Sequence, residues 1–112
     1  MTLLLDGDAR LEANDAVLTA SGEADFDVAS MLAATGREWL EQQAEGSSVA
    51  FDFKQVDQAS SAVLSVILEW LRCAQRKALV VESIDLSSPL ARVTEMAGLE
   101  KLLTKGAVEH AH

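Results

Sequence analysis

The sequence predicts an α/β fold in which helices pack on a mixed β-sheet of four to five strands. Short apolar segments bounded by turn residues alternate with longer amphipathic segments, in the order β-β-β-α-β-α-β-α. Strands that alternate with helices favour a parallel or mixed sheet. The chain has 112 residues, 49% of them hydrophobic, which is enough for one hydrophobic core. Residues 1–112 are therefore expected to form a single domain.

Three short strands are expected before the first helix. Residues 3–5 and 11–13 are apolar segments on either side of a turn at Asp6-Gly7-Asp8. Asn14 and Asp15 are typical turn residues, so the third strand is expected at 16–20, ending at Ser21-Gly22.

The first helix is expected over residues 28–44, with Asp25 or Asp27 as its N-cap. Gly46-Ser47-Ser48 would end it. Residues 49–53 read V-A-F-D-F, which indicates a buried strand interrupted by one acid.

The second helix is expected over residues 62–77, capped by Ser60 or Ser61. On a helical wheel, the side that should face the sheet carries Leu64, Ile67, Leu71 and Ala74. The opposite, solvent-facing side carries Ser61, Ser65, Glu69, Arg72 and Arg76. Val66, Trp70 and Cys73 widen the apolar arc on one flank. Two interpretations of Trp70 remain open: it packs against a neighbouring helix, or it borders a protein-binding surface.

The last part of the chain is expected to form one strand and one helix. Residues 78–81 are apolar without alternation, which is typical of a central strand buried on both faces. Ser88 and Pro89 indicate an N-cap followed by proline at the first helical position, and Gly98 would close that helix. Residues 105–112 are expected to be a flexible tail.

Charge and cysteine content exclude several classes of partner and compartment. The chain has 9 Lys and Arg against 18 Asp and Glu, a net charge of -9, whereas nucleic acids and anionic membranes bind basic surfaces. No nucleic-acid partner is therefore expected. No direct membrane insertion is expected either, because no apolar stretch approaches the roughly 20 residues needed to span a bilayer. Cys73 is the single cysteine, which is typical of a reducing compartment. The N-terminus lacks the features of a signal peptide, so the protein is expected in the cytoplasm.

No catalytic chemistry is expected. Both histidines, His110 and His112, lie in the tail, which removes Ser-His-Asp and Cys-His mechanisms from the folded part. Glu23, Asp25 and Asp27 could bind a hard cation if they lay on extended chain, but carboxylates before a helix serve more simply as its caps. We expect no metal, no cofactor and no enzymatic activity.

Three segments of the chain carry a family resemblance: L-T-A-S-G-E-A-D-F-D-V (18–28), F-D-F-K-Q-V followed by S-S-A-V-L-S-V-I-L (51–56 and 60–68), and S-P-L-A-R-V-T-E-M-A-G-L (88–99). Together they resemble the STAS family. Their order and spacing agree with the family throughout. The resemblance is strongest to the STAS subunits of Mla-type phospholipid-transport ABC systems, and it extends to the anti-sigma-factor antagonists. Ser60 stands where the family commonly has Asp, and Val63 stands where it has Gly.

The resemblance implies a protein-binding role centred on Ser61. This position corresponds to the phosphorylatable Ser or Thr of the antagonists, and to a Thr that meets the ATPase in the transporter subunits. A transporter subunit would bind the ATPase at the inner membrane through Ser60, Ser61, Ala62 and Ser65, together with Asp25, Phe26 and Asp27. The alternative is an antagonist whose partner is an anti-sigma-factor kinase that phosphorylates Ser61.

Overall fold

The computed structural model describes residues 2–7, 9–23, 26–56 and 61–96. Within them the chain forms five strands and three helices, which confirms the predicted α/β class and element order. The elements are β1 (Thr2–Asp6), β2 (Ala9–Asn14), β3 (Val17–Gly22), α1 (Phe26–Glu41), β4 (Ser48–Val56), α2 (Ser61–Arg76), β5 (Val80–Leu86) and α3 (Ser88–Met96).

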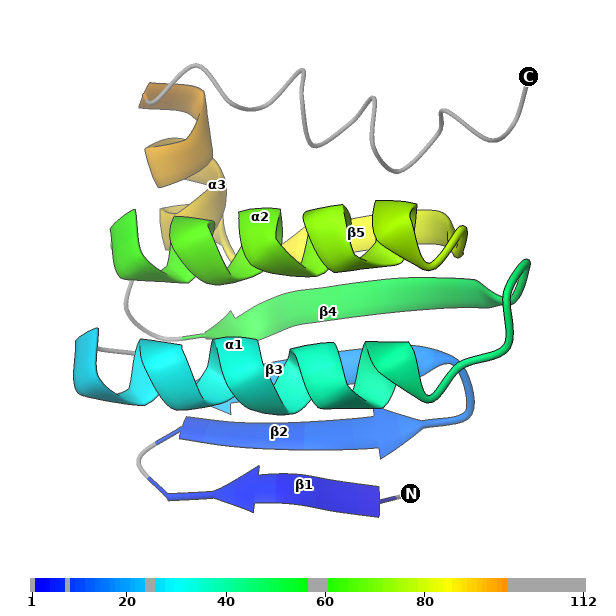
Figure 1. Ribbon diagram of the computed structural model, residues 1–112. Helices are drawn as coiled ribbons and strands as arrows, with labels where there is room; N and C mark the ends of the chain where they lie inside the picture. The colour runs from blue at the N-terminus through cyan, green and yellow to red at the C-terminus, as the bar shows by residue number, and fades with distance from the viewer. Residues whose placement is uncertain (1, 8, 24–25, 57–60, 97–112) are drawn as a thin grey trace.

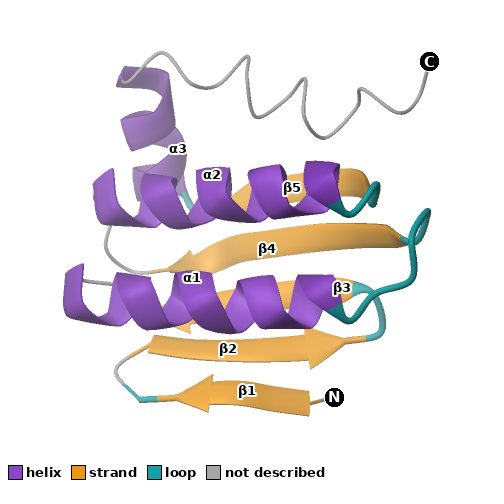
Figure 2. Cartoon of the chain, in the orientation of Figure 1, coloured by secondary structure: helices purple, strands orange, loops and turns teal. Residues whose placement is uncertain are grey.

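The strands form one mixed sheet in the order β1-β2-β3-β4-β5. The first three strands pair antiparallel, and β3, β4 and β5 pair parallel. Helices α1 and α2 connect neighbouring parallel strands and lie side by side on one face of the sheet, as Figure 1 shows. α3 follows β5 and runs across the direction of those two helices (Figure 2).

The core lies between this helix pair and the sheet, and β4 shows how it is built. Val49, Phe51 and Phe53 alternate along the strand and are buried beneath the helices. Asp52, the acid that interrupts the apolar run, points to the other face of the sheet. There it stays partly exposed, and its Oδ1 accepts a hydrogen bond from the Lys54 backbone N–H at 2.9 Å. The interruption is thus the ordinary two-residue alternation of a strand.

The C-terminus of α2 differs from the sequence-based prediction. Ala78, expected to begin a strand, instead adopts a left-handed backbone with φ of 59°. The Leu79 N–H donates to the Ala74 carbonyl at 2.8 Å, and the Ala78 N–H donates to the Gln75 carbonyl at 3.1 Å. This is a Schellman cap, in which glycine usually occupies the position of Ala78. Residues 78 and 79 therefore end the helix, and the strand begins at Val80.

The prediction that this strand is central and buried on both faces is also wrong. β5 lies at the edge of the sheet and continues to Leu86 through polar residues. Its register with β4 shifts between Val81 and Ser83, so Glu82 is an extra residue. Such a bulge breaks the alternation of apolar and polar residues, which hid the second half of the strand in the sequence.

The cap of α3 lies one residue before the predicted position. The helix begins at Ser88, and the Ser87 hydroxyl accepts a hydrogen bond from the Leu90 backbone N–H at 3.4 Å. The Ser87 carbonyl accepts the Ala91 N–H at 2.8 Å. Ser87 is therefore the N-cap, and Pro89 is the second helical residue. Gly98 and the tail at 105–112 lie outside the described residues.

Replacing Ala78 with glycine is expected to stabilise the domain by about 0.5–1 kcal/mol. A left-handed conformation costs an L-residue about 1–2 kcal/mol, and the greater freedom of glycine in the unfolded chain offsets part of the gain. Urea unfolding would measure the change. As a control, Ala91→Gly in the exposed part of α3 should destabilise by about 1 kcal/mol, because Ala91 has ordinary helical geometry. Loss of stability in Ala78→Gly would contradict the assignment of the cap.

Candidate functional site

Helices α1 and α2 begin at the same edge of the sheet. α1 follows β3 and α2 follows β4, and these two strands are parallel neighbours. The carboxyl ends of both strands therefore meet one edge, from which both helices start and run in the same direction (Figure 1). The topology thus brings the start of α1 near residues 26–27 close to the start of α2 near residues 61–62, although about 35 residues separate them in sequence.

α2 uses two sides for packing, which explains its wide apolar arc. Leu64, Ile67, Leu71 and Ala74, the residues predicted to face the sheet, are all buried. Val66, Trp70 and Cys73 on the flank are buried as well, on the side of α1. Ser65, Arg72 and Arg76 are exposed, as predicted for the solvent side.

Trp70 joins the two helices and the sheet. Its side chain is fully buried, and its ring lies 5.4 Å from Phe51 and 5.2 Å from Phe53, measured between ring centroids. The indole Nε1–H donates to the Ala33 carbonyl of α1 at 3.2 Å. The interpretation that Trp70 packs against a neighbouring helix is confirmed, and the alternative that it borders an interaction surface is wrong.

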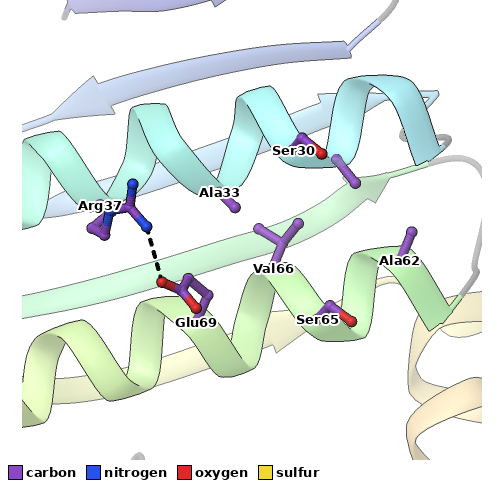
Figure 3. A pocket seen from close by; sticks show the side chains of 8 residues that line it. Ser30, Ala33, Arg37, Ala62, Ser65, Val66 and Glu69 are labelled. Carbon is purple, nitrogen blue, oxygen red and sulfur yellow. Dashed lines mark hydrogen bonds and ion pairs between the residues drawn. The ribbon is translucent and has the colours of Figure 1, made fainter.

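The two helices leave a hollow between their outer surfaces. Its volume is about 340 Å³. Most of the side chains that line it are small, and the full set is Ala29, Ser30, Ala33 and Arg37 from α1 with Ala62, Ser65, Val66 and Glu69 from α2 (Figure 3). Toward the C-terminal ends of the helices the Arg37 Nη1 donates to the Glu69 Oε1 at 3.1 Å, so an ion pair closes that end. We call this feature the α1–α2 hollow.

Two of the predicted binding residues line this hollow. Ala62 is buried, whereas Ser65 is exposed. Ser61 is the first residue of α2, and Phe26 and Asp27 are the first two residues of α1. Because Asp27 lies inside the helix, it is not the N-cap. Asp25 and Ser60 lie outside the described residues.

The residues that α1 contributes to the hollow were not predicted from the sequence. Ala29, Ala33 and Arg37 recur at four-residue intervals and so share one side of the helix. Small residues at that spacing are a signal for close approach of a second helix. The wheel of α2 alone could not show which side of α1 would meet it.

The hollow does not provide the groups of a metal site. In the part of the chain that the structure describes, no three His, Cys, Asp or Glu side chains come together to hold an ion. The Glu23, Asp25 and Asp27 set considered above includes Asp25, which lies outside those residues. What the hollow offers is a surface for small or apolar groups beside charged side chains.

None of the helices within the described residues combines the length and hydrophobicity needed to cross a membrane.

Comparison with known protein families identifies one that matches the chain. A family model described as "Mlab, STAS domain" matches residues 8–104 of the chain. This span covers every element from β2 to α3, including both helices that form the hollow. No curated protein matches the chain significantly.

Proposed function

Because the chain belongs to the STAS family of MlaB-like domains, we propose that it is a non-enzymatic accessory subunit of an Mla-type phospholipid-transport ABC system. In this role it binds the cytosolic ATPase of the transporter and regulates it. The family match carries the proposal, since it extends over nearly the whole domain. The protein would lie in the cytoplasm, held at the inner membrane by its partner.

The surface proposed to contact the ATPase is the edge where α1 and α2 begin. It comprises Ser60, Ser61, Ala62 and Ser65 with Asp25, Phe26 and Asp27. Two features support this choice: the topology brings both helix starts to one edge, and the α1–α2 hollow opens beside Ala62 and Ser65. An accessory subunit needs a surface of this kind and no catalytic group. No cofactor forms part of the proposal.

Ser61→Asp is expected to weaken binding to the purified ATPase at least tenfold while leaving the fold intact. An acidic group in the first turn of a helix is favourable toward the helix dipole, so stability should stay level or rise slightly. At the interface, the same charge would enter a surface that the partner must desolvate. Isothermal titration calorimetry with the ATPase measures the first effect, and thermal unfolding measures the second.

Ser88→Asp is the matched control, because Ser88 is likewise the first residue of a helix, α3, and is exposed. It should bind as the unchanged protein does. Equal loss of binding in both variants would contradict the assignment of the surface, and unfolding of Ser61→Asp would show that Ser61 is only structural.

The alternative partner is an anti-sigma-factor kinase that phosphorylates Ser61. Affinity purification from the native cell, read by mass spectrometry, separates the two functions. Recovery of an ABC ATPase with its permease supports the transporter role. Recovery of a kinase-like anti-sigma factor, with phosphate on Ser61, would replace it with the regulatory one.

A further inference from the structure

The outer side of α2 carries two arginines that the fold does not use. Ser65, Glu69, Arg72 and Arg76 follow one another at three- and four-residue intervals, so they form one stripe along the helix. Glu69 is engaged by Arg37 of α1. Arg72 and Arg76 are exposed, and neither forms a hydrogen bond or ion pair with any residue that the structure describes.

The charge near the C-terminal end of α2 is positive, whereas the net charge of the whole chain is negative. The net charge is -9, yet four of the nine Lys and Arg residues are Arg37, Arg72, Arg76 and the adjoining Lys77. A cation in the last turn of a helix interacts favourably with the dipole, which accounts for Arg76. The dipole does not account for Arg72, which lies one turn earlier, or for the alignment of both arginines with Ser65.

The stripe begins in the α1–α2 hollow, because Ser65 and Glu69 line it, and runs past the Arg37–Glu69 ion pair toward the C-terminus of α2. Val66 lines the hollow, and a helix rises about 1.5 Å per residue, so Arg72 lies roughly 9 Å and Arg76 roughly 15 Å further along the axis. Glu69 is the lining residue of α2 that is nearest in sequence to Arg72, and it forms an ion pair with Arg37 (Figure 3). A hollow lined by small side chains, followed by cations about two and three turns further along, matches an amphipathic helix laid in a groove.

We propose that the stripe and the hollow together receive an acidic amphipathic helix of the partner protein. Its apolar side chains enter the α1–α2 hollow, and its carboxylates, two to three turns along, pair with Arg72 and Arg76. The charge expected of the partner at this point is thus negative, although the net charge of the chain alone favours a basic partner. This inference rests on the proposed function for the partner's identity, and on the geometry of α2 for the partner's chemistry.

The test compares two double charge reversals. Arg72→Glu with Arg76→Glu changes the stripe, and Lys54→Glu with Arg92→Glu changes two exposed cations on β4 and α3. Both doubles change the net charge equally. Tagged full-length protein is purified from its native cell in each form, recovered proteins are identified by mass spectrometry, and binding is then measured with the purified partner. Thermal unfolding checks that both doubles fold.

We expect the stripe variant to lose at least tenfold in affinity for the ATPase and the control variant to keep its affinity. Carboxylate-to-lysine changes in one helix of the partner should restore the affinity of the stripe variant. If a different identified protein shows this same dependence in purified form, the inference stands and the transporter function fails. If the ATPase binds both doubles equally, the function stands and the inference is overturned. If the unchanged protein recovers no partner, both are overturned.

Discussion

Ile67→Asp is expected to leave the domain unfolded under native conditions. Ile67 lies on the sheet-facing side of α2 and is fully buried in the core. A carboxylate there would be ionised without a partner or would stay protonated with its polar oxygens unpaired, and either state is costly in an apolar interior. Such substitutions cost about 4–5 kcal/mol or more, which reaches the whole stability of a small domain near the lower end of the usual range of about 5–15 kcal/mol.

Circular dichroism and urea unfolding would measure the loss of stability, and two further substitutions provide reference values. Ile67→Val removes one methylene from the same site and should cost only about 0.5–1.5 kcal/mol. Gln75→Asp places a carboxylate on the exposed side of the same helix and should cost about 1 kcal/mol or less. A folded Ile67→Asp with near-normal stability would mean that α2 packs on the sheet by another face.

Gly36→Ala is expected to destabilise the domain by at least about 3 kcal/mol. In an exposed helix this change normally stabilises by about 1 kcal/mol, so the prediction reverses the usual sign. A Cβ added at Gly36 would overlap the indole of Trp70 far inside van der Waals contact. Trp70 cannot retreat, because Phe51 and Phe53 pack against it and its Nε1–H is bonded to the Ala33 carbonyl. The helices must therefore separate.

Gly7→Ala provides the control for this effect. Among the residues that the structure describes, a Cβ at Gly7 would meet only the Ala9 carbonyl oxygen, at 3.9 Å, and should change stability by about 0.5 kcal/mol or less. A double-mutant cycle adds a sharper test. If the clash is with Trp70, then combining Gly36→Ala with Trp70→Phe should cost less than the sum of the two single changes. Additive costs would place the strain elsewhere.

These two positions fix the packing beneath the edge that is proposed to bind the ATPase. Ile67 fixes α2 on the sheet, and the Gly36–Trp70 contact fixes α2 against α1. Substitutions at the outer residues of the hollow, such as Ser65, can then be interpreted by their effect on binding, because these residues take part in neither contact.

Sequence patterns predicted the fold well where structure depends on local periodicity. The alternation in V-A-F-D-F and the apolar arc of α2 gave β4 and the sheet-facing side of the helix correctly. The prediction failed where residues act through an exception to local preference. Ala78 occupies a left-handed position that glycine usually takes, and the extra residue Glu82 interrupts the alternation of β5. Neither exception has a signature in the amino-acid types themselves.

For the candidate site, the sequence determined that Ser65, Arg72 and Arg76 of α2 face solvent, and which family the chain resembles, because helical periodicity and motif order are properties of neighbouring residues. Only the tertiary structure decided that Trp70 is internal, and that Ala29, Ala33 and Arg37 complete a hollow with α2. The physical reason is that the rotation of α1 about its axis depends on contacts between residues more than thirty positions apart, such as Gly36 with Trp70 and Arg37 with Glu69. Such contacts require that the parallel strands place both helices on the same face of the sheet.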